Sequence, residues 1–186
     1  CPNMATMLSV VLCDAQVEAS VWQKMLRDAV ELTFNRVTVD GDTSTNDTLY
    51  GLANGASGVS ASDEESLKAL SAALTSVLGD LAYMLVKDGE GASKVARIHV
   101  AGAASDADAE RVARTVGHSQ LVKTALYGRD ANWGRIVAAV GRSGADFNPD
   151  DVVVTLCGVE LFRKGQPTDL DFDALLEEPL KQRDLP

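Results

Sequence analysis

Clustered basic residues, long apolar runs and paired cysteines are all scarce in this sequence of 186 residues. Acidic residues outnumber Lys and Arg by 27 to 17, which gives a formal net charge of −10, and no Lys/Arg cluster is present. Because nucleic-acid binding requires clustered cations that neutralise phosphates, we expect no nucleic-acid partner. The uncharged apolar runs are far shorter than the roughly 18 residues of a membrane span, so we expect no membrane helix.

Cysteine and histidine are too few to predict a disulfide framework or a metal centre. The three cysteines, Cys1, Cys13 and Cys157, are far apart and odd in number, which favours reduced thiols and a cytoplasmic setting. The two histidines, His99 and His118, have no Cys or His at ligand spacing, so no metal site is predicted. The start at Cys1, without an initiator Met or a signal-peptide pattern, is expected of a piece of a longer protein.

The residues that are present are typical of a globular protein, with 46% apolar and 24% charged side chains. The expected strands are residues 7–12, 37–39, 95–100, 152–156 and 159–162, the last two forming a hairpin at Gly158. The expected helices are residues 14–32, 62–88, 106–116, 119–127 and 132–140. This mixture predicts an α/β (α+β) fold of mixed sheets flanked by helices. We expect a first lobe over residues 1–118 and a smaller C-terminal lobe over residues 119–186.

The longest predicted helix begins at a capping box, Ser62-x-x-Glu65. Its apolar residues recur every three or four positions and so predict one stripe that faces a core: Leu67, Leu70, Leu74, Val77, Leu78, Leu81 and Leu85.

Thr6 is the first candidate for chemistry, and the residues alone leave two interpretations open. It is either an ordinary threonine at the start of a strand or an N-terminal nucleophile. A threonine hydroxyl is a weak nucleophile without a nearby base, and the free α-amine of the same residue, with a pKa of about 7.7–8.0, is such a base. That amine exists only after cleavage of the bond between Ala5 and Thr6, where the small Ala5 leaves its carbonyl open to attack.

Three further segments have both a structural and a functional interpretation. Residues 40–47 (DGDTSTND) are either a solvated turn that caps a helix, or a set of hydroxyls and backbone N–H groups that bind a carboxylate or phosphate. Residues 88–94 (DGEGASK) place Glu90 between two glycines, as a solvated loop residue or as a carboxylate that pairs with an ammonium group. Residues 128–135 (GRDANWGR) bring a Trp and two Arg to a helix start. They are either a functional motif or a helix cap with a packed Trp.

Together these segments resemble the ornithine acetyltransferase family of arginine biosynthesis, the bifunctional glutamate N-acetyltransferases. The matching stretches occur in the family order and are residues 2–8 (PNMATML), 39–48 (VDGDTSTNDT), 88–94 (DGEGASK), 121–125 (LVKTA) and 128–136 (GRDANWGRI). The likeness is weaker beyond Ile136, and Ala131 stands where many relatives have Pro. The resemblance implies an N-terminal-nucleophile-like fold.

The resemblance also implies a precursor that cleaves itself between Ala5 and Thr6, so that this chain is the β chain with five α-chain residues attached. Thr6 is then the catalytic nucleophile, which takes acetyl from N2-acetylornithine and passes it to glutamate, and Thr6 and Glu90 bind the substrate. No metal or resident cofactor is implied, although some relatives use acetyl-CoA as a co-substrate. The implied partners are the α chain and the two amino acids, in a cytoplasmic heterotetramer of two α and two β chains.

Other parts of the implied site fall outside this sequence. The family's oxyanion-hole pair and a substrate-contacting Lys are expected before Cys1, and a substrate-binding Asn and Thr after Pro186, so the chain alone is expected to be inactive. Two alternatives stay open. One is an N-terminal-nucleophile amidase or aminopeptidase, in which water takes the acyl group. The other is a non-catalytic acidic interaction domain in which Thr6 is only a strand residue.

Overall fold

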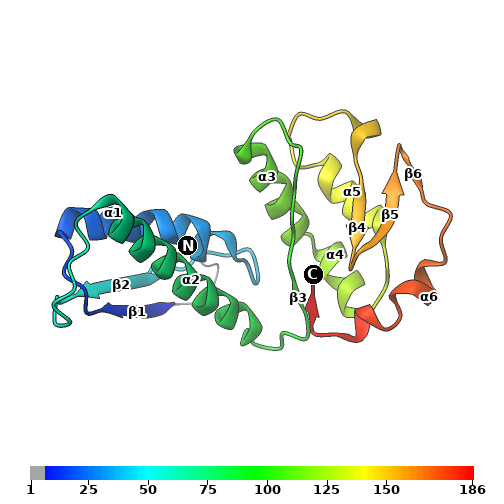
Figure 1. The fold of residues 1–186 in the computed structure, drawn as a ribbon. Coiled ribbons are helices and arrows are strands. Elements are labelled where there is room, and N and C mark those ends of the chain that lie inside the picture. The colour runs from blue at the N-terminus through cyan, green and yellow to red at the C-terminus, as the bar shows by residue number, and fades with distance from the viewer. Residues whose placement is uncertain (1–6) are drawn as a thin grey trace. The chain divides into compact units, whose positions relative to one another are not determined.

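The computed structural model describes residues 7–186, which divide into two compact units, residues 7–90 and 91–186 (Figure 1). The lobe boundary expected at residues 118–119 falls inside the second unit. It lies between helices α3 (Asp106–Gly117) and α4 (Gln120–Tyr127).

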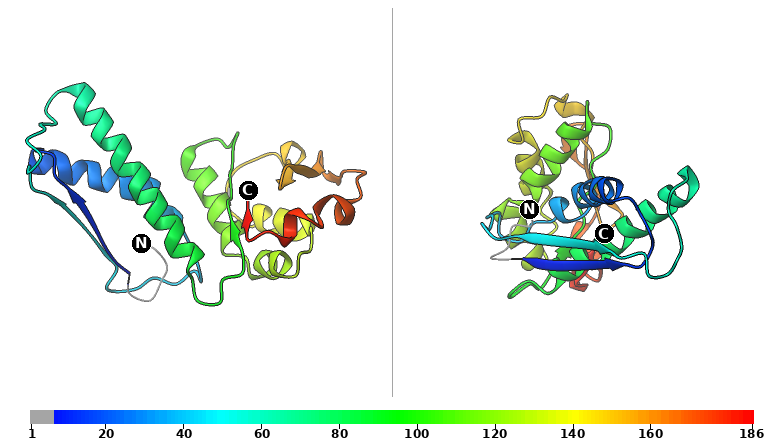
Figure 2. Two further views of the ribbon diagram at one scale, coloured as in Figure 1. Left: turned by 60° about the horizontal axis from the view of Figure 1, so that its bottom comes forward. Right: turned by 90° about the vertical axis from the view of Figure 1, so that its left-hand side faces the viewer.

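The first unit is built on a pair of parallel strands. Its elements in chain order are β1 (Leu8–Cys13), α1 (Ala19–Leu32), the 3₁₀ turn η1 (Phe34–Arg36), β2 (Thr48–Ala53) and α2 (Glu64–Lys87). Strands β1 and β2 pair in register from Leu8 opposite Thr48 to Cys13 opposite Ala53. Parallel strands need a crossover connection, which α1 supplies. Both views of Figure 2 show α1 and α2 on the same side of this strand pair.

The core of the first unit lies between these two helices and the inner face of the strands. Its buried members include Val11, Trp22, Met25, Ala29, Phe34, Leu74, Leu78 and Ala82. The Trp22 indole N–H donates to the Gly51 carbonyl at 3.0 Å, which ties α1 to β2. Gly51 allows this close approach, because a Cβ there would lie 2.8 Å from a Leu26 methyl group.

The long helix α2 confirms the predicted stripe with one exception. Leu74 and Leu78 are buried and Leu67, Leu70, Leu81 and Leu85 pack against the same core, whereas Val77 is exposed. Although the sequence predicted no membrane helix, α2 is long and apolar enough to cross a membrane by length and composition alone, the one such helix among residues 7–186. Core helices of globular proteins have the same composition, and the inner face of α2 is part of this core.

Three local predictions in the first unit are wrong. Helix α1 begins at Ala19 with Glu18 as its cap, so the expected start at Asp14 is too early. The capping box of α2 is one residue later than predicted, because the Asp63 carboxylate accepts from Ser66 N at 2.8 Å and Ser66 Oγ accepts from Asp63 N. The hydroxyl-rich segment before residue 48 leads into strand β2 and does not enter a helix.

The second unit combines four α-helices with short strands. Its elements are β3 (Val95–Ala96), α3, α4, α5 (Trp133–Gly141), η2 (Pro149–Asp151), β4 (Val154–Leu156), β5 (Val159–Arg163), β6 (Gln166–Pro167), α6 (Phe172–Leu176), η3 (Pro179–Lys181) and β7 (Asp184–Leu185). The predicted hairpin is confirmed as the antiparallel pair β4–β5, and β6 extends it to three strands. The strand expected over residues 95–100 is shorter, because only Val95 and Ala96 pair, in parallel with β7.

Two apolar clusters hold the second unit together. Leu161, Leu176, Leu180 and Leu185 are almost completely buried in one of them, and Trp133 stacks on Phe162 beside it with ring centroids 5.3 Å apart. Val116, Val122 and Ala139 join α3, α4 and α5 in the other. The mixed α/β architecture predicted from the sequence is therefore present in this unit as in the first.

Candidate functional site

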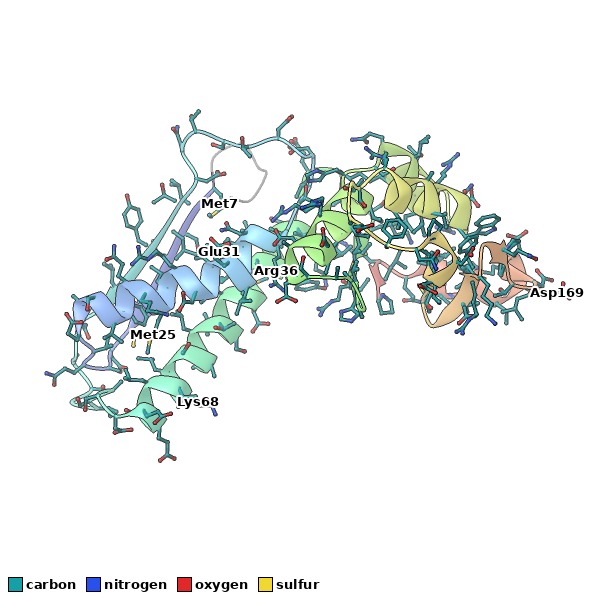
Figure 3. All side chains as sticks on the ribbon, turned by 90° about the horizontal axis from the view of Figure 1, so that it is seen from above. Met7, Met25, Glu31, Arg36, Lys68 and Asp169 are labelled. Atoms are coloured by element: carbon teal, nitrogen blue, oxygen red, sulfur yellow. The ribbon has the colours of Figure 1, made fainter. Side chains whose placement is uncertain are left out.

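The predicted nucleophile Thr6 and the preceding Ala5 lie outside the described residues, which begin at the next residue, Met7. Met7 is buried in the core of the first unit. Its N–H donates to Asp47 Oδ1 at 2.8 Å, and its carbonyl accepts from Thr48 N at 2.8 Å. Figure 3 shows Met7 at the start of β1. Both backbone groups of the residue that follows Thr6 are therefore held in place.

The loop that supplies Asp47 is shaped by its own small polar side chains. Asp40 Oδ1 accepts from Asp42 N at 2.9 Å, Ser44 Oγ accepts from Asn46 N at 3.1 Å, and the Thr48 hydroxyl donates to the Asn46 carbonyl. These are the short-range turns that Asp, Asn and Ser favour. The sequence indicated this segment as a whole but not Asp47 in particular. Residue 47 lies next to residue 7 because β1 and β2 pair in parallel with Leu8 opposite Thr48. Only that register identifies Asp47.

Glu90 follows the end of α2 and has an exposed side chain. The turn is closed by backbone bonds from Asp88 N to Met84 O and from Gly89 N to Val86 O, and Gly91 continues it with a left-handed φ of +71°. Among residues 7–186 the Glu90 carboxylate has no hydrogen-bond or ion-pair partner. It is therefore available to a ligand cation, as the functional interpretation of the segment requires.

The outer face of the β1–β2 pair is an exposed apolar surface of the first unit. We call "outer face" the five side chains that point away from α1 and α2: Leu8, Val10, Leu12, Tyr50 and Leu52. Each of them is between 56% and 74% exposed. Parallel sheets are ordinarily covered on both faces, and an exposed contiguous apolar patch marks an interaction site.

Two of the motifs that carry the family resemblance meet in the second unit. The Arg135 guanidinium donates to the Leu121 carbonyl at 3.0 Å and to the Thr124 hydroxyl at 3.2 Å, so residues 128–136 are fastened to residues 121–125. Asn132 caps α5 by accepting from Arg135 N at 3.1 Å. Trp133 packs into the core, so in this motif the cap and the packed Trp are both present.

Candidate metal ligands do not gather in the part of the chain that the structure describes, where no group of three or more His, Cys, Asp or Glu side chains could hold an ion. Burial lowers the pKa of His118, and Lys123 and Arg114 lower it further. Burial also raises the pKa of the Cys157 thiol. Both shifts disfavour the charged form of the group.

Comparison with known proteins gives one consistent result. The family model described as "ArgJ family" matches residues 1–185. The chain is 75% identical over 185 residues to the "Arginine biosynthesis bifunctional protein ArgJ" of Nitratidesulfovibrio vulgaris and 51% identical over 175 residues to the protein of that name from a Synechococcus strain. These alignments cover 100% and 93% of this chain but 47% and 42% of the relatives, so the chain spans about half their length.

A solved structure matches almost the whole chain. The crystal structure of the Arginine biosynthesis bifunctional protein argJ from Bacillus halodurans aligns with a TM-score of 0.87 and 36% sequence identity. The alignment covers 96% of this chain and 84% of the solved chain. The predicted mixed α/β fold class is thereby confirmed.

Proposed function

The chain belongs to the ArgJ family, and on that premise we propose that it forms the nucleophile-bearing part of a glutamate N-acetyltransferase. The resemblance to the ornithine acetyltransferase family, which short motifs had indicated, is confirmed. The observation that carries the proposal is the locked backbone of Met7. A nucleophile at the preceding residue needs a fixed backbone, and Asp47 and Thr48 hold the Met7 N–H and carbonyl.

The proposed reaction has two acyl-transfer steps. The Thr6 hydroxyl, with the α-amine of Thr6 as base, attacks the acetyl carbonyl of N2-acetylornithine, and ornithine leaves with the proton. The amine of glutamate then attacks the acetyl-threonine ester, forms N-acetylglutamate and returns the proton to the Thr6 oxygen. The Glu90 carboxylate binds the ammonium group of a substrate. No resident cofactor takes part, and acetyl-CoA is an alternative acetyl donor.

The proposed partner is an upstream α chain, released when the precursor cleaves itself between Ala5 and Thr6. Two observations support it. This chain covers 84% of the solved Bacillus halodurans chain but only 47% of the Nitratidesulfovibrio vulgaris relative, so the solved chain is itself far shorter than the full-length relative. The outer face also leaves a parallel sheet uncovered, which an additional chain would bury. We propose a heterotetramer of two α and two β chains.

We place the protein in the cytoplasm. The described cysteines, Cys13 and Cys157, are free thiols, which suits a reducing compartment. Relatives from Physcomitrium patens and Oryza sativa are named as chloroplastic proteins.

The test of the proposed function is an acetyl-transfer assay on protein made from the complete reading frame. With acetylornithine as donor, ornithine release is expected to require glutamate and to yield N-acetylglutamate. Release of free acetate at the same rate without glutamate would instead identify an amidase, the alternative in which water takes the acyl group. Absence of both reactions in a precursor that stays intact would favour the non-catalytic interaction domain.

Changing Glu90 to Gln is expected to weaken substrate use while leaving self-cleavage intact. The substitution keeps the shape of the side chain but removes the charge that faces the substrate ammonium group. A hydrogen bond to a charged group contributes about 1.5–3 kcal/mol, so kcat/KM should fall about tenfold to a hundredfold. Steady-state kinetics with both substrates measure the loss, and unchanged kinetics would make Glu90 a loop residue only.

Changing Asp47 to Ala is expected to slow self-cleavage about tenfold or more. The Met7 amide loses a charged acceptor worth about 1.5–3 kcal/mol, and the peptide before it is no longer held. Asp47→Asn keeps an oxygen in the same place and is expected to restore most of the rate. Cleavage time courses on denaturing gels check this. If Asp47→Ala cleaves as fast as the wild type, Asp47 does not position the nucleophile.

A further inference from the structure

The second unit contains a pocket of about 470 Å³ that none of the roles above uses. It is lined by Ser93, Lys94, Tyr127, Gly128, Arg129 and Lys181. Three of these residues are cationic and none is acidic. Such convergence of like charge is unusual in a chain with a net charge of −10.

Arg129 reaches this pocket from a strained backbone position. Helix α4 ends in a Schellman motif, in which Arg129 N donates to Leu126 O at 3.2 Å and Asp130 N donates to Ala125 O at 2.9 Å. The residue at the left-handed position of this motif is ordinarily Gly, but here it is Arg129, with φ +58°. A glycine is available one residue earlier, at Gly128, and the chain nevertheless keeps an arginine where it is disfavoured. Strained residues of this kind cluster at functional sites.

The cations of the pocket are only partly neutralised. Among residues 7–186 the Arg129 guanidinium and the Ser93 hydroxyl have no hydrogen-bond or ion-pair partner. Lys94 Nζ donates to the carbonyls of Leu180 and Gln182 at 2.5 and 2.6 Å, which leaves its third proton available.

Lys94 and Lys181 differ in how far nearby carboxylates neutralise their positive charges. Burial lowers the pKa of Lys94, and the nearby charge of Arg129 lowers it further, so the charges of these two cations lie close to each other. Lys181 is paired with Glu177 and Glu178, which lie between α6 and η3, at 2.9 and 2.6 Å. An incoming anion would therefore gain most from Lys94 and Arg129.

We propose that this pocket binds the phosphate groups of a small nucleotide-like ligand. The planar guanidinium of Arg129 matches two phosphate oxygens at once, and Lys94 and Ser93 donate to others. Tyr127 is 73% exposed and lines the same pocket, and its ring provides a surface on which a base can stack. The proposal stands apart from the acetyl transfer above and does not depend on it.

Calorimetric titration of protein made from the complete reading frame tests the proposal. ADP is expected to bind, pyrophosphate to bind more weakly, and adenosine not to bind, whereas glutamate, which binds at the acetyl-transfer site, is expected to bind Arg129→Gln and the wild type equally. Arg129→Gln should weaken ADP binding about tenfold to a hundredfold, since a charge-assisted bidentate contact is lost. Arg142→Gln removes an equal charge from an exposed position of the same unit and should leave ADP binding unchanged. Failure of ADP to bind, or equal binding by Arg129→Gln and the wild type, would overturn the proposal.

The variant Arg129→Gly separates the effect of residue 129 on ADP binding from its effect on the stability of the protein. Arg129→Gly relieves the left-handed strain, so its thermal midpoint is expected to rise by about 2–4 °C while ADP binding falls as in Arg129→Gln. A lower midpoint together with weakened binding would assign Arg129 a structural role and overturn the proposal. Glutamate binding that depends on Arg129 would likewise overturn it in favour of a carboxylate site.

Discussion

Replacing Thr6 by Ala in the complete protein is expected to abolish both self-cleavage and acetyl transfer. One hydroxyl serves the two reactions, first attacking the Ala5 carbonyl and later the acetyl carbonyl of the donor. Removal of a nucleophile from a covalent mechanism costs more than about 10⁴-fold in rate. Intact mass of the purified protein reports cleavage, and N-acetylglutamate formation from acetylornithine reports transfer.

Thr6→Ser is the matched control, because it keeps a hydroxyl and loses only a methyl group. We expect it to cleave measurably and, once cleaved, to transfer acetyl with its new α-amine as base. The assignment of Thr6 as the nucleophile requires that self-cleavage and acetyl transfer are lost or kept together. An alanine variant that still splits between Ala5 and Thr6 would contradict the assignment, as would an uncleaved precursor with full transferase activity.

Helices were the part of the fold that the sequence predicted best. The leucine stripe of α2 repeats every three or four residues, and burial of Leu74 and Leu78 follows directly from that period. Helix starts were less predictable, because several good caps lie close together. Asp14 and Glu18 are both acidic residues before α1; Glu18 is the one that caps the helix, and the Asp14 carbonyl accepts from Ser57 N in a loop.

Strand β2 was missed because its local sequence does not alternate. On its outer face Tyr50 and Leu52 are apolar, so the period-two contrast of a half-buried strand is absent. The small polar residues before Thr48 also resemble a helix cap. Only the pairing with β1, which is distant in sequence, identifies this segment as a strand.

A short motif is enough to propose a chemical role, as for Thr6 and Glu90, whose roles in the site stay predictions. A role that depends on distant contacts could not be predicted in this way. Asp47 holds Met7 across a separation of 40 residues, through the strand register. Arg129 enters a pocket because a helix ends in a left-handed turn, and Lys94 meets it from another part of the chain. Such juxtapositions follow from tertiary packing and leave no local pattern.

The second large effect is expected from a substitution on the outer face, which should weaken the association of the two chains. Val10 lies in its middle, opposite Tyr50 in the parallel register, and is 56% exposed. If the upstream chain covers this face, Val10→Asp both loses a buried side chain worth about 1.5–3 kcal/mol and places an unpaired carboxylate in the interface. We expect the affinity between the two chains to fall by at least about a thousandfold.

Val59→Asp is the matched control for this prediction. Val59 belongs to the same unit and is 63% exposed, but it lies in the loop before α2 and outside the outer face. The same valine-to-aspartate change there adds an equal charge to exposed surface, so the two chains should remain associated. Both variants are made from the complete reading frame with a tag on the upstream segment, and recovery of this chain after purification is compared. Because precursor that fails to cleave keeps the chains joined, recovery is scored only on cleaved molecules. Equal recovery of cleaved chains from Val10→Asp and Val59→Asp would show that the upstream chain binds elsewhere and that the outer face is not its contact surface.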